Sequence, residues 1–152
     1  MRRAASAGQD IRASAADVAI LLSNNEIGVR SRARPDVWSP LEYACHLRDV
    51  LLVQRERVLA ARRTSGHDCA SMGREERAEH DGYSEQDPAE VARQLADAAA
   101  LFSNVLARLS ADDWDRTVLY HYPETRERSL RWVAVHTVHE LQHHLLDIRR
   151  QL

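Results

Sequence analysis

The stretch AVHTVHELQHHLLDIRRQL, residues 134–152, decides the fold. Its apolar residues recur at steps of four and three, and these are Ala134, Val138, Leu141, Leu145, Ile148 and Leu152. That spacing follows the repeat of about 3.6 residues per helical turn and gives the narrow apolar stripe of a helix in a bundle. The sequence therefore predicts a last helix, capped at Ser129, that buries one face against other helices.

The same stretch carries four histidines and one glutamate, namely His136, His139, Glu140, His143 and His144. At about 100° per residue, Glu140 and His144 fall on the shoulder of the apolar stripe. His139 and His143 fall on the opposite side of the helix, and His136 lies between the two groups. We therefore expect Glu140 and His144 to face the protein interior.

A second interpretation of this stretch stays open. His139-Glu140-Leu141-Gln142-His143 matches the H-E-x-x-H pattern, in which both histidines bind zinc and the glutamate acts as a base. That role requires both histidines to line a cleft, whereas the helical spacing turns them away from the core. His139 and His143 are thus an alternative set of metal ligands, in a zinc hydrolase, or interface residues in a helical homodimer.

Three more helices are predicted upstream. Ser39 is a favourable N-cap, Pro40 suits the first helical position, and Glu42 lies three residues after the cap, as in a capping box. Asp87 is likewise a favourable N-cap, and Pro88 suits the first position of the next helix. The predicted helices are Ala15–Val29, Pro40 to about Arg63, and Asp87 to about Leu109.

These elements predict an all-α fold, a four-helix bundle formed by one domain over residues 1–152. Residues 1–12 are expected to be disordered. A polar stretch with three glycines, residues 64–87, is expected to form a long connection between the second and third helices. Residues 119–123 are expected to be extended, but no convincing set of strands is predicted.

Composition excludes several classes of function. The formal net charge is −2, and the 21 basic residues are all arginines without a dense basic block, which argues against nucleic-acid binding. No apolar run approaches the length of about 18 residues that a membrane span needs. Two cysteines, Cys45 and Cys69, are too few for a disulfide scaffold and indicate reduced thiols. We expect a cytoplasmic protein that acts on a small-molecule substrate.

The second helix supplies a further candidate ligand, His46. Together with Glu140 and His144 it would offer three ligands to a divalent metal, zinc or nickel, and leave positions open for water or substrate. Cys45, beside His46, is either a soft metal ligand or a small core residue. Candidates for orienting an imidazole or for contacting a substrate are Asp49, His136 and Tyr83.

These motifs resemble the DinB-like superfamily of metal-binding four-helix proteins. The resemblance rests on Trp38-Ser39-Pro40-Leu41-Glu42-Tyr43-Ala44-Cys45-His46-Leu47 and on Glu140-Leu141-Gln142-His143-His144-Leu145-Leu146-Asp147-Ile148. It implies metal binding by a histidine of the second helix and by two residues four apart in the last helix, here His46, Glu140 and His144.

The His/Glu/His set is similar to that of the mycothiol-dependent maleylpyruvate isomerases within this superfamily. This likeness implies a metal-dependent enzyme that activates a low-molecular-weight thiol, mycothiol if the source is an actinobacterium, as the lysine-free composition suggests. Because the isomerases carry an added C-terminal domain, the shorter chain fits a thiol S-transferase better. The alternative from another class is a non-catalytic, metal-binding stress-response module.

Overall fold

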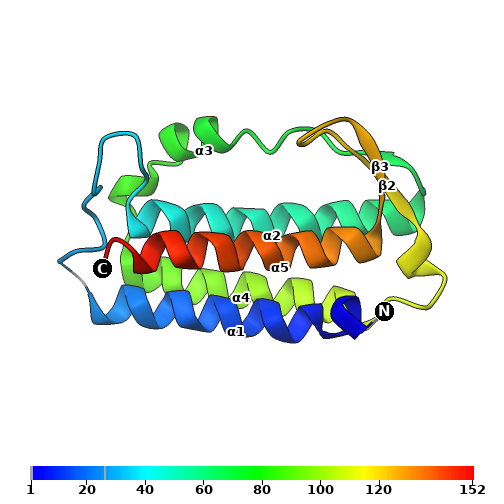
Figure 1. Ribbon diagram of the computed structural model, residues 1–152, viewed down its shortest axis with the longest axis horizontal. Coiled ribbons are helices and arrows are strands. Elements are labelled where there is room, and N and C mark those ends of the chain that lie inside the picture. Colours follow the sequence, from blue (N-terminus) through cyan, green and yellow to red (C-terminus); the bar gives the residue numbers. More distant parts are fainter. Residues whose placement is uncertain (1, 26) are drawn as a thin grey trace.

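The computed structural model describes residues 2–25 and 27–152, and the side chains of all of these except residues 2 and 3. Four long helices lie side by side in Figure 1 and form a bundle. They are α1 (Arg2–Asn24), α2 (Pro40–Arg63), α4 (Pro88–Ala107) and α5 (Leu130–Arg149). The prediction of a four-helix bundle is confirmed.

The order of the helices around the bundle differs from their order in the chain. Helices α1 and α2 each pack mainly against α4 and α5, so that α1 and α2, although consecutive, lie on a diagonal. Figure 1 shows α2 and α4 running in the same direction and α5 running antiparallel to α2. Since α2 and α4 are parallel, the chain must return along the whole bundle between them, which is why a long connection is needed.

That connection is confirmed, and it contains more regular structure than its polar sequence predicts. It holds β1 (His67–Asp68), α3 (Arg74–His80) and the short 3₁₀ helix η1 (Tyr83–Glu85), and it passes outside α2 (Figure 1). Strand β1 pairs in parallel with β2 (Thr117–Tyr120), which pairs antiparallel with β3 (Arg126–Ser129). A 3₁₀ turn, η2 (Asp113–Asp115), precedes β2.

The predicted helix starts are confirmed by their caps. The Ser39 hydroxyl accepts from the Glu42 amide, and the Glu42 carboxylate accepts from the Ser39 amide at 2.8 Å. The Asp87 carboxylate accepts from the Glu90 amide, and the Ser129 hydroxyl caps α5 in the same way. These caps fix where α2 and α5 begin and therefore which of their faces turn inward.

The prediction for the N-terminal region was wrong. Helix α1 starts at Arg2 instead of Ala15 and ends at Asn24 instead of Val29, so residues 2–12 are helical and not disordered. The reason is close packing: Ala7 and Ile11 are fully buried, and the Ser103 hydroxyl of α4 donates to the Gly8 carbonyl at 2.8 Å. Small residues allow α4 to approach here. Met1 and Glu26, which belong to the two predicted ranges, lie outside the described residues.

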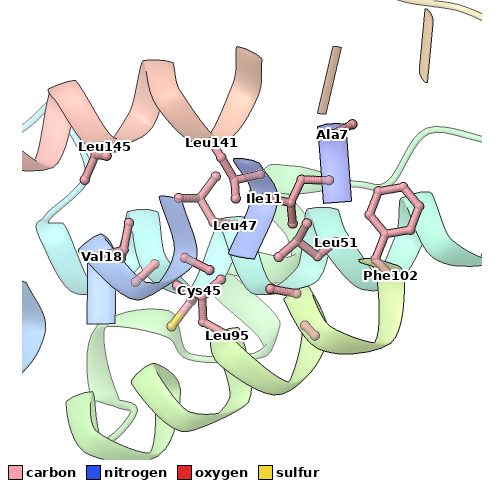
Figure 2. Packing of buried hydrophobic residues seen from close by; sticks show 14 of the residues in the cluster. Ala7, Ile11, Val18, Cys45, Leu47, Leu51, Leu95, Phe102, Leu141 and Leu145 are labelled. Carbon is pink, nitrogen blue, oxygen red and sulfur yellow. The ribbon is translucent and has the colours of Figure 1, made fainter. Parts of the chain in front are cut away.

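The core fills the space between the four helices. Figure 2 shows side chains of all four helices in this space, among them Ile11 of α1, Leu51 of α2, Leu95 of α4 and Leu141 of α5. Cys45 belongs to this core as a fully buried residue, and burial raises the pKa of its thiol to about 12. Within the described ranges, no helix is both long and apolar enough to cross a membrane.

Candidate metal centre

The antiparallel pairing of α2 and α5 brings together the three residues that the sequence suggested as ligands. His46, Glu140 and His144 each offer one donor atom, and these atoms lie within 4.8 Å of one another. His46 comes from the second turn of α2, whereas Glu140 and His144 are neighbours one turn apart on α5. The fold therefore gathers two nitrogen donors and one oxygen donor at one place.

Aromatic side chains hold both imidazoles in position. The His46 ring lies 5.2 Å from the Trp38 ring and stands nearly perpendicular to the His144 ring, at 5.3 Å. The His144 ring stacks on Tyr43, with centroids 4.9 Å apart. Both histidines are buried, at 3% and 8% exposure. Packing of this kind would hold the two side chains in place before a metal arrives, which would lower the entropic cost of binding.

His46 carries an unsatisfied buried atom. Its Nδ1 has no hydrogen-bond partner in the part of the chain that the structure describes. Burial, followed by the nearby charges of His144 and Arg74, lowers the pKa of His46 to about 4, so the ring is neutral at pH 7. An unpaired polar atom in the interior is costly, and a neutral imidazole is the form that binds metal. The residue thus fits a metal ligand better than a structural core histidine.

The other two candidate ligands interact with each other. Glu140 Oε2 lies 3.6 Å from His144 Nε2, and this closeness, opposed by burial, lowers the pKa of Glu140 to about 2. The carboxylate is therefore ionised at neutral pH. The opposite nitrogen of His144, Nδ1, lies 3.1 Å from Asp147 Oδ2. Donation from Nδ1 to Asp147 would leave the Nε2 lone pair directed at the site, as in carboxylate–histidine–metal arrangements.

Asp147 was not identified from the sequence, and Asp49 was suggested for its role. Asp49 instead accepts from Arg48 Nε at 2.9 Å and from the Tyr83 hydroxyl at 2.5 Å. Tyr83 is fully buried, and its hydroxyl is directed at Asp49 and not at the pocket. The charged guanidinium next in sequence is a stronger partner for Asp49 than a neutral imidazole. Asp49 and Tyr83 thus attach the connection to α2.

The remaining histidines of α5 separate into two groups. His136 lines the pocket and stacks on Trp132 with centroids 4.4 Å apart, and burial lowers its pKa. His139 and His143 are exposed and stack on each other at 6.2 Å. His143 reaches the rim of the pocket and forms a second, more exposed donor group with His144 and Asp147, but His139 belongs to neither group. The structure does not bring the H-E-x-x-H pair together around the pocket.

The three candidate ligands lie in a pocket of about 460 Å³. It is lined by α2, α5, the connection and β2, which contributes Tyr120. Gln54 and Arg57 of α2 also line it and were not identified from the sequence. The signal was present, because Val50, Gln54 and Arg57 follow His46 at helical steps of four, four and three. A small molecule of moderate size fits this space.

Comparisons with known proteins agree with the fold. A solved structure, "YfiT from Bacillus subtilis is a probable metal-dependent hydrolase with an unusual four-helix bundle topology", matches with a TM-score of 0.77 at 15% identity. The match covers 95% of this chain and 85% of that chain, and at this identity it shows the fold alone. A comparison with curated proteins gave no match. The family model of the DinB superfamily matches residues 11–148, nearly the whole chain. The chain therefore belongs to the DinB superfamily.

Proposed function

We propose that the protein is a metal-dependent thiol S-transferase, which activates a low-molecular-weight thiol, such as mycothiol, toward an electrophilic substrate. The observation that carries this proposal is the cluster of His46, Glu140 and His144 in the lining of one pocket. Two imidazoles and one carboxylate suit zinc or nickel and leave coordination positions open. A divalent ion held there would act as a Lewis acid and lower the pKa of a thiol in the pocket.

The acid–base groups of the pocket favour a thiol over water as the nucleophile. Glu140 is the only carboxylate among the described residues that line it, and a ligand role leaves no second carboxylate to act as a base. Three further imidazoles line the pocket, and of these His121 and His143 are exposed. His136, one turn before Glu140, is half-buried, and the burial that lowers its pKa keeps it neutral and able to accept a proton. A thiol is easier to deprotonate than water, so a single imidazole suffices.

The proposed reaction consists of a proton transfer from the thiol and the formation of one carbon–sulfur bond. The thiol proton passes to the free nitrogen of His136 or to solvent, and the thiolate sulfur forms a bond to an electrophilic carbon of the substrate. The leaving group departs with the electron pair of the broken bond. Tyr120 and Trp132 hold the His136 ring at 5.7 Å and 4.4 Å, which keeps it at the pocket wall for this transfer.

A metal-dependent hydrolase is the second candidate, because YfiT is described as a probable metal-dependent hydrolase. In that case water would take the place of the thiol, and His136 would remove its proton. The same three ligands would serve both reactions, so metal binding alone does not separate them.

Assays of both reactions on one preparation test the proposal. Protein purified without an affinity tag is analysed for bound metals and then assayed for conjugation of monochlorobimane to small thiols and for hydrolysis of nitrophenyl esters. We expect bound zinc or nickel and conjugation that is lost in His46→Gln and kept in His139→Gln, the exposed histidine used as a control. Ester hydrolysis without conjugation would favour the second candidate. Metal without any turnover would favour a stress-response module.

A further inference from the structure

Arg57 lies in the same pocket as the candidate ligands and has only neutral partners. Its Nη2 donates to the Ala70 carbonyl at 2.6 Å, and its Nη1 lies 3.3 Å from both the Tyr120 hydroxyl and the Gln54 side-chain oxygen. Its guanidinium also sits over the Tyr120 ring. Among the described side chains, no carboxylate lies within ion-pair distance of it. The guanidinium is thus oriented by its neighbours while its charge stays uncompensated.

The helical spacing places Arg57 at the opposite end of the pocket from the three-ligand cluster. Eleven residues separate His46 from Arg57, which is about 16 Å along the helix axis, and the arginine side chain leans back toward the N-terminus of α2. The gap between the guanidinium and the cluster is therefore roughly 10 Å. Along α5, His136 lies toward the Arg57 end and His144 at the ligand end. The two ends of the pocket lining thus differ in chemistry, with the candidate ligands at one end and a guanidinium at the other.

The charge of the pocket contrasts with that of the whole chain. The described residues that line it include two arginines, Arg57 and Arg74, but one carboxylate, Glu140, while the chain has a formal net charge of −2. A divalent cation held by Glu140 would make the pocket more positive still. A partly enclosed, positive pocket in a negatively charged protein concentrates small anions.

We infer that Arg57 binds the carboxylate of an elongated organic anion, whose other end reaches the His46/Glu140/His144 cluster. The planar guanidinium matches a carboxylate in two parallel hydrogen bonds, which a lysine does not reproduce. This inference rests on the proposed function, because it names the chemical class of the substrate for that site. The carboxylate belongs either to the thiol or to the electrophile, and the experiment below separates the two.

Bifunctional probes test the distance between the two ends of the pocket. Straight-chain mercaptocarboxylates of increasing length, and the mercaptoalcohols of matching length, are titrated into cobalt-loaded protein, where a thiolate–cobalt absorption band reports binding. We expect one carboxylate chain length to bind about tenfold tighter than its alcohol, the gain typical of a charge-assisted hydrogen-bonded contact. This preference should disappear in Arg57→Met and be partly kept in Arg57→Lys. Arg63→Met is the control, since Arg63 is exposed on the same helix and lies outside the pocket.

The results of the titrations distinguish a failure of the role of Arg57 from a failure of the thiol reaction. Equal affinities for acids and alcohols, or an unchanged preference in Arg57→Met, would overturn the role of Arg57 even if the band forms. If no thiol produces a band, the thiol reaction fails, and calorimetric titration of the metal-free protein with the same acids still tests Arg57. Helical circular dichroism equal to that of the unaltered protein verifies the folding of each variant.

A kinetic comparison identifies which reactant carries the carboxylate. In one series, a benzylic chloride that bears a carboxylate and its methyl ester are each conjugated to the same neutral thiol. In the reverse series, a thiol that bears a carboxylate and its amide are each conjugated to the same neutral electrophile. We expect Arg57→Met to raise KM about tenfold for the carboxylate form of one reactant, with kcat changing less. Equal KM changes for charged and neutral forms of both reactants would overturn the inference.

Discussion

At the scale of single residues, His144 has a carboxylate on each side of its ring. Glu140 faces Nε2, whereas Asp147 faces Nδ1 at 3.1 Å. Only Glu140 belongs to the three-ligand cluster, so the two carboxylates have different expected roles. Glu140 would bind the metal, and Asp147 would select the tautomer of His144 that offers its Nε2 lone pair.

Replacement of Asp147 tests whether this carboxylate orients the His144 ring. We expect Asp147→Asn to weaken metal binding by about 10- to 100-fold, the range typical for partners of metal-binding histidines. Competition with a chromophoric chelator measures the affinity. Asp17→Asn is the control, because Asp17 is an exposed residue of α1 that pairs with Arg149, away from the site. An Asp147→Asn affinity equal to that of the control would exclude the orienting role.

The pH dependence of the metal-free protein tests the burial of His46. Its pKa falls from 6.5 to about 4 on folding, so the unfolded chain binds more protons between these pH values. Stability should therefore be intact above about pH 6.5 and decline as the pH falls toward 4, by on the order of 3 kcal/mol. Urea unfolding at a series of pH values measures this slope.

Two variants test whether the change of unfolding free energy with pH comes from His46. His46→Gln should make the curve shallower between pH 6.5 and 4, because glutamine does not titrate, and the remaining slope includes His136, whose pKa burial also lowers. His139→Gln, at an exposed position outside the cluster, is the control. Below pH 4.5 a further decline is expected in both, since the pKa of Glu140 is lowered to about 2 and its stabilising contribution is lost on protonation. Identical slopes in the two variants would contradict the assignment to His46.

At the scale of helices and strands, the start of α2 determines where His46 lies. The capping box at Ser39 and Glu42 is buried, and two guanidinium nitrogens of Arg32 donate to the Glu42 carboxylate at 2.9 Å and 2.6 Å. Trp38, immediately before the cap, packs against the His46 ring. Helix capping and positioning of the ligand thus depend on the same few residues.

Removal of the cap should have a measurable cost. Ser39→Ala removes the acceptor of the Glu42 amide in a fully buried position, and we expect a loss of about 1–2 kcal/mol in the free energy of unfolding. Denaturant unfolding measures it. The comparison is Ser23→Ala near the end of α1, an exposed serine whose hydroxyl donates to the Ala19 carbonyl, where a change below about 0.5 kcal/mol is expected. Similar losses in both would contradict the importance of the cap.

Three of the four long helices could be predicted from the sequence, but the first turns of α1 and the sheet could not. Helices α2, α4 and α5 were predictable because their caps are local signals, a few residues long. The first turns of α1 were missed because residues 4–10 lack large apolar side chains, and their burial depends on the close approach of α4. The sheet was missed because strands of two to four residues have no clear alternation.

Part of the geometry of the candidate site could also be predicted from the sequence. The helical angles of Glu140 and His144 follow from spacing on one helix, so their shared inward face could be worked out. The partners of Asp49 and Tyr83 could not, because they depend on the path of a connection that covers α2. Arg57 and Asp147 lie on the faces of α2 and α5 that carry the candidate ligands. What these two side chains contact follows only from the packing of the folded protein.

At the scale of the whole molecule, the candidate ligands join the two halves of the chain. His46 and Glu140 lie in helices that are adjacent in the bundle, although ninety-four residues separate them in sequence. A metal bound by both would therefore stabilise the folded state of the entire domain. Metal binding should be coupled to folding, as for other ligands that bind only the native protein.

Thermal unfolding measures this coupling. At a free metal concentration of about 100 times the dissociation constant, linkage predicts about 2.7 kcal/mol of stabilisation, which raises Tm by roughly 5–10 °C for a domain of this size. Chelation should reverse the shift. His46→Gln should lose it, and His139→Gln should keep it. A shift of equal size in His46→Gln would show that the metal binds elsewhere.

The diagonal placement of α1 and α2 has a consequence during synthesis on the ribosome. His46 emerges early, but its neighbours in the bundle, α4 and α5, are translated later. A nascent polypeptide that ends before α5 thus carries only His46 of the three candidate ligands, and the cluster is incomplete. Metal binding at the candidate site would therefore follow translation of α5, and cellular metal pools would meet a finished bundle and not a growing chain.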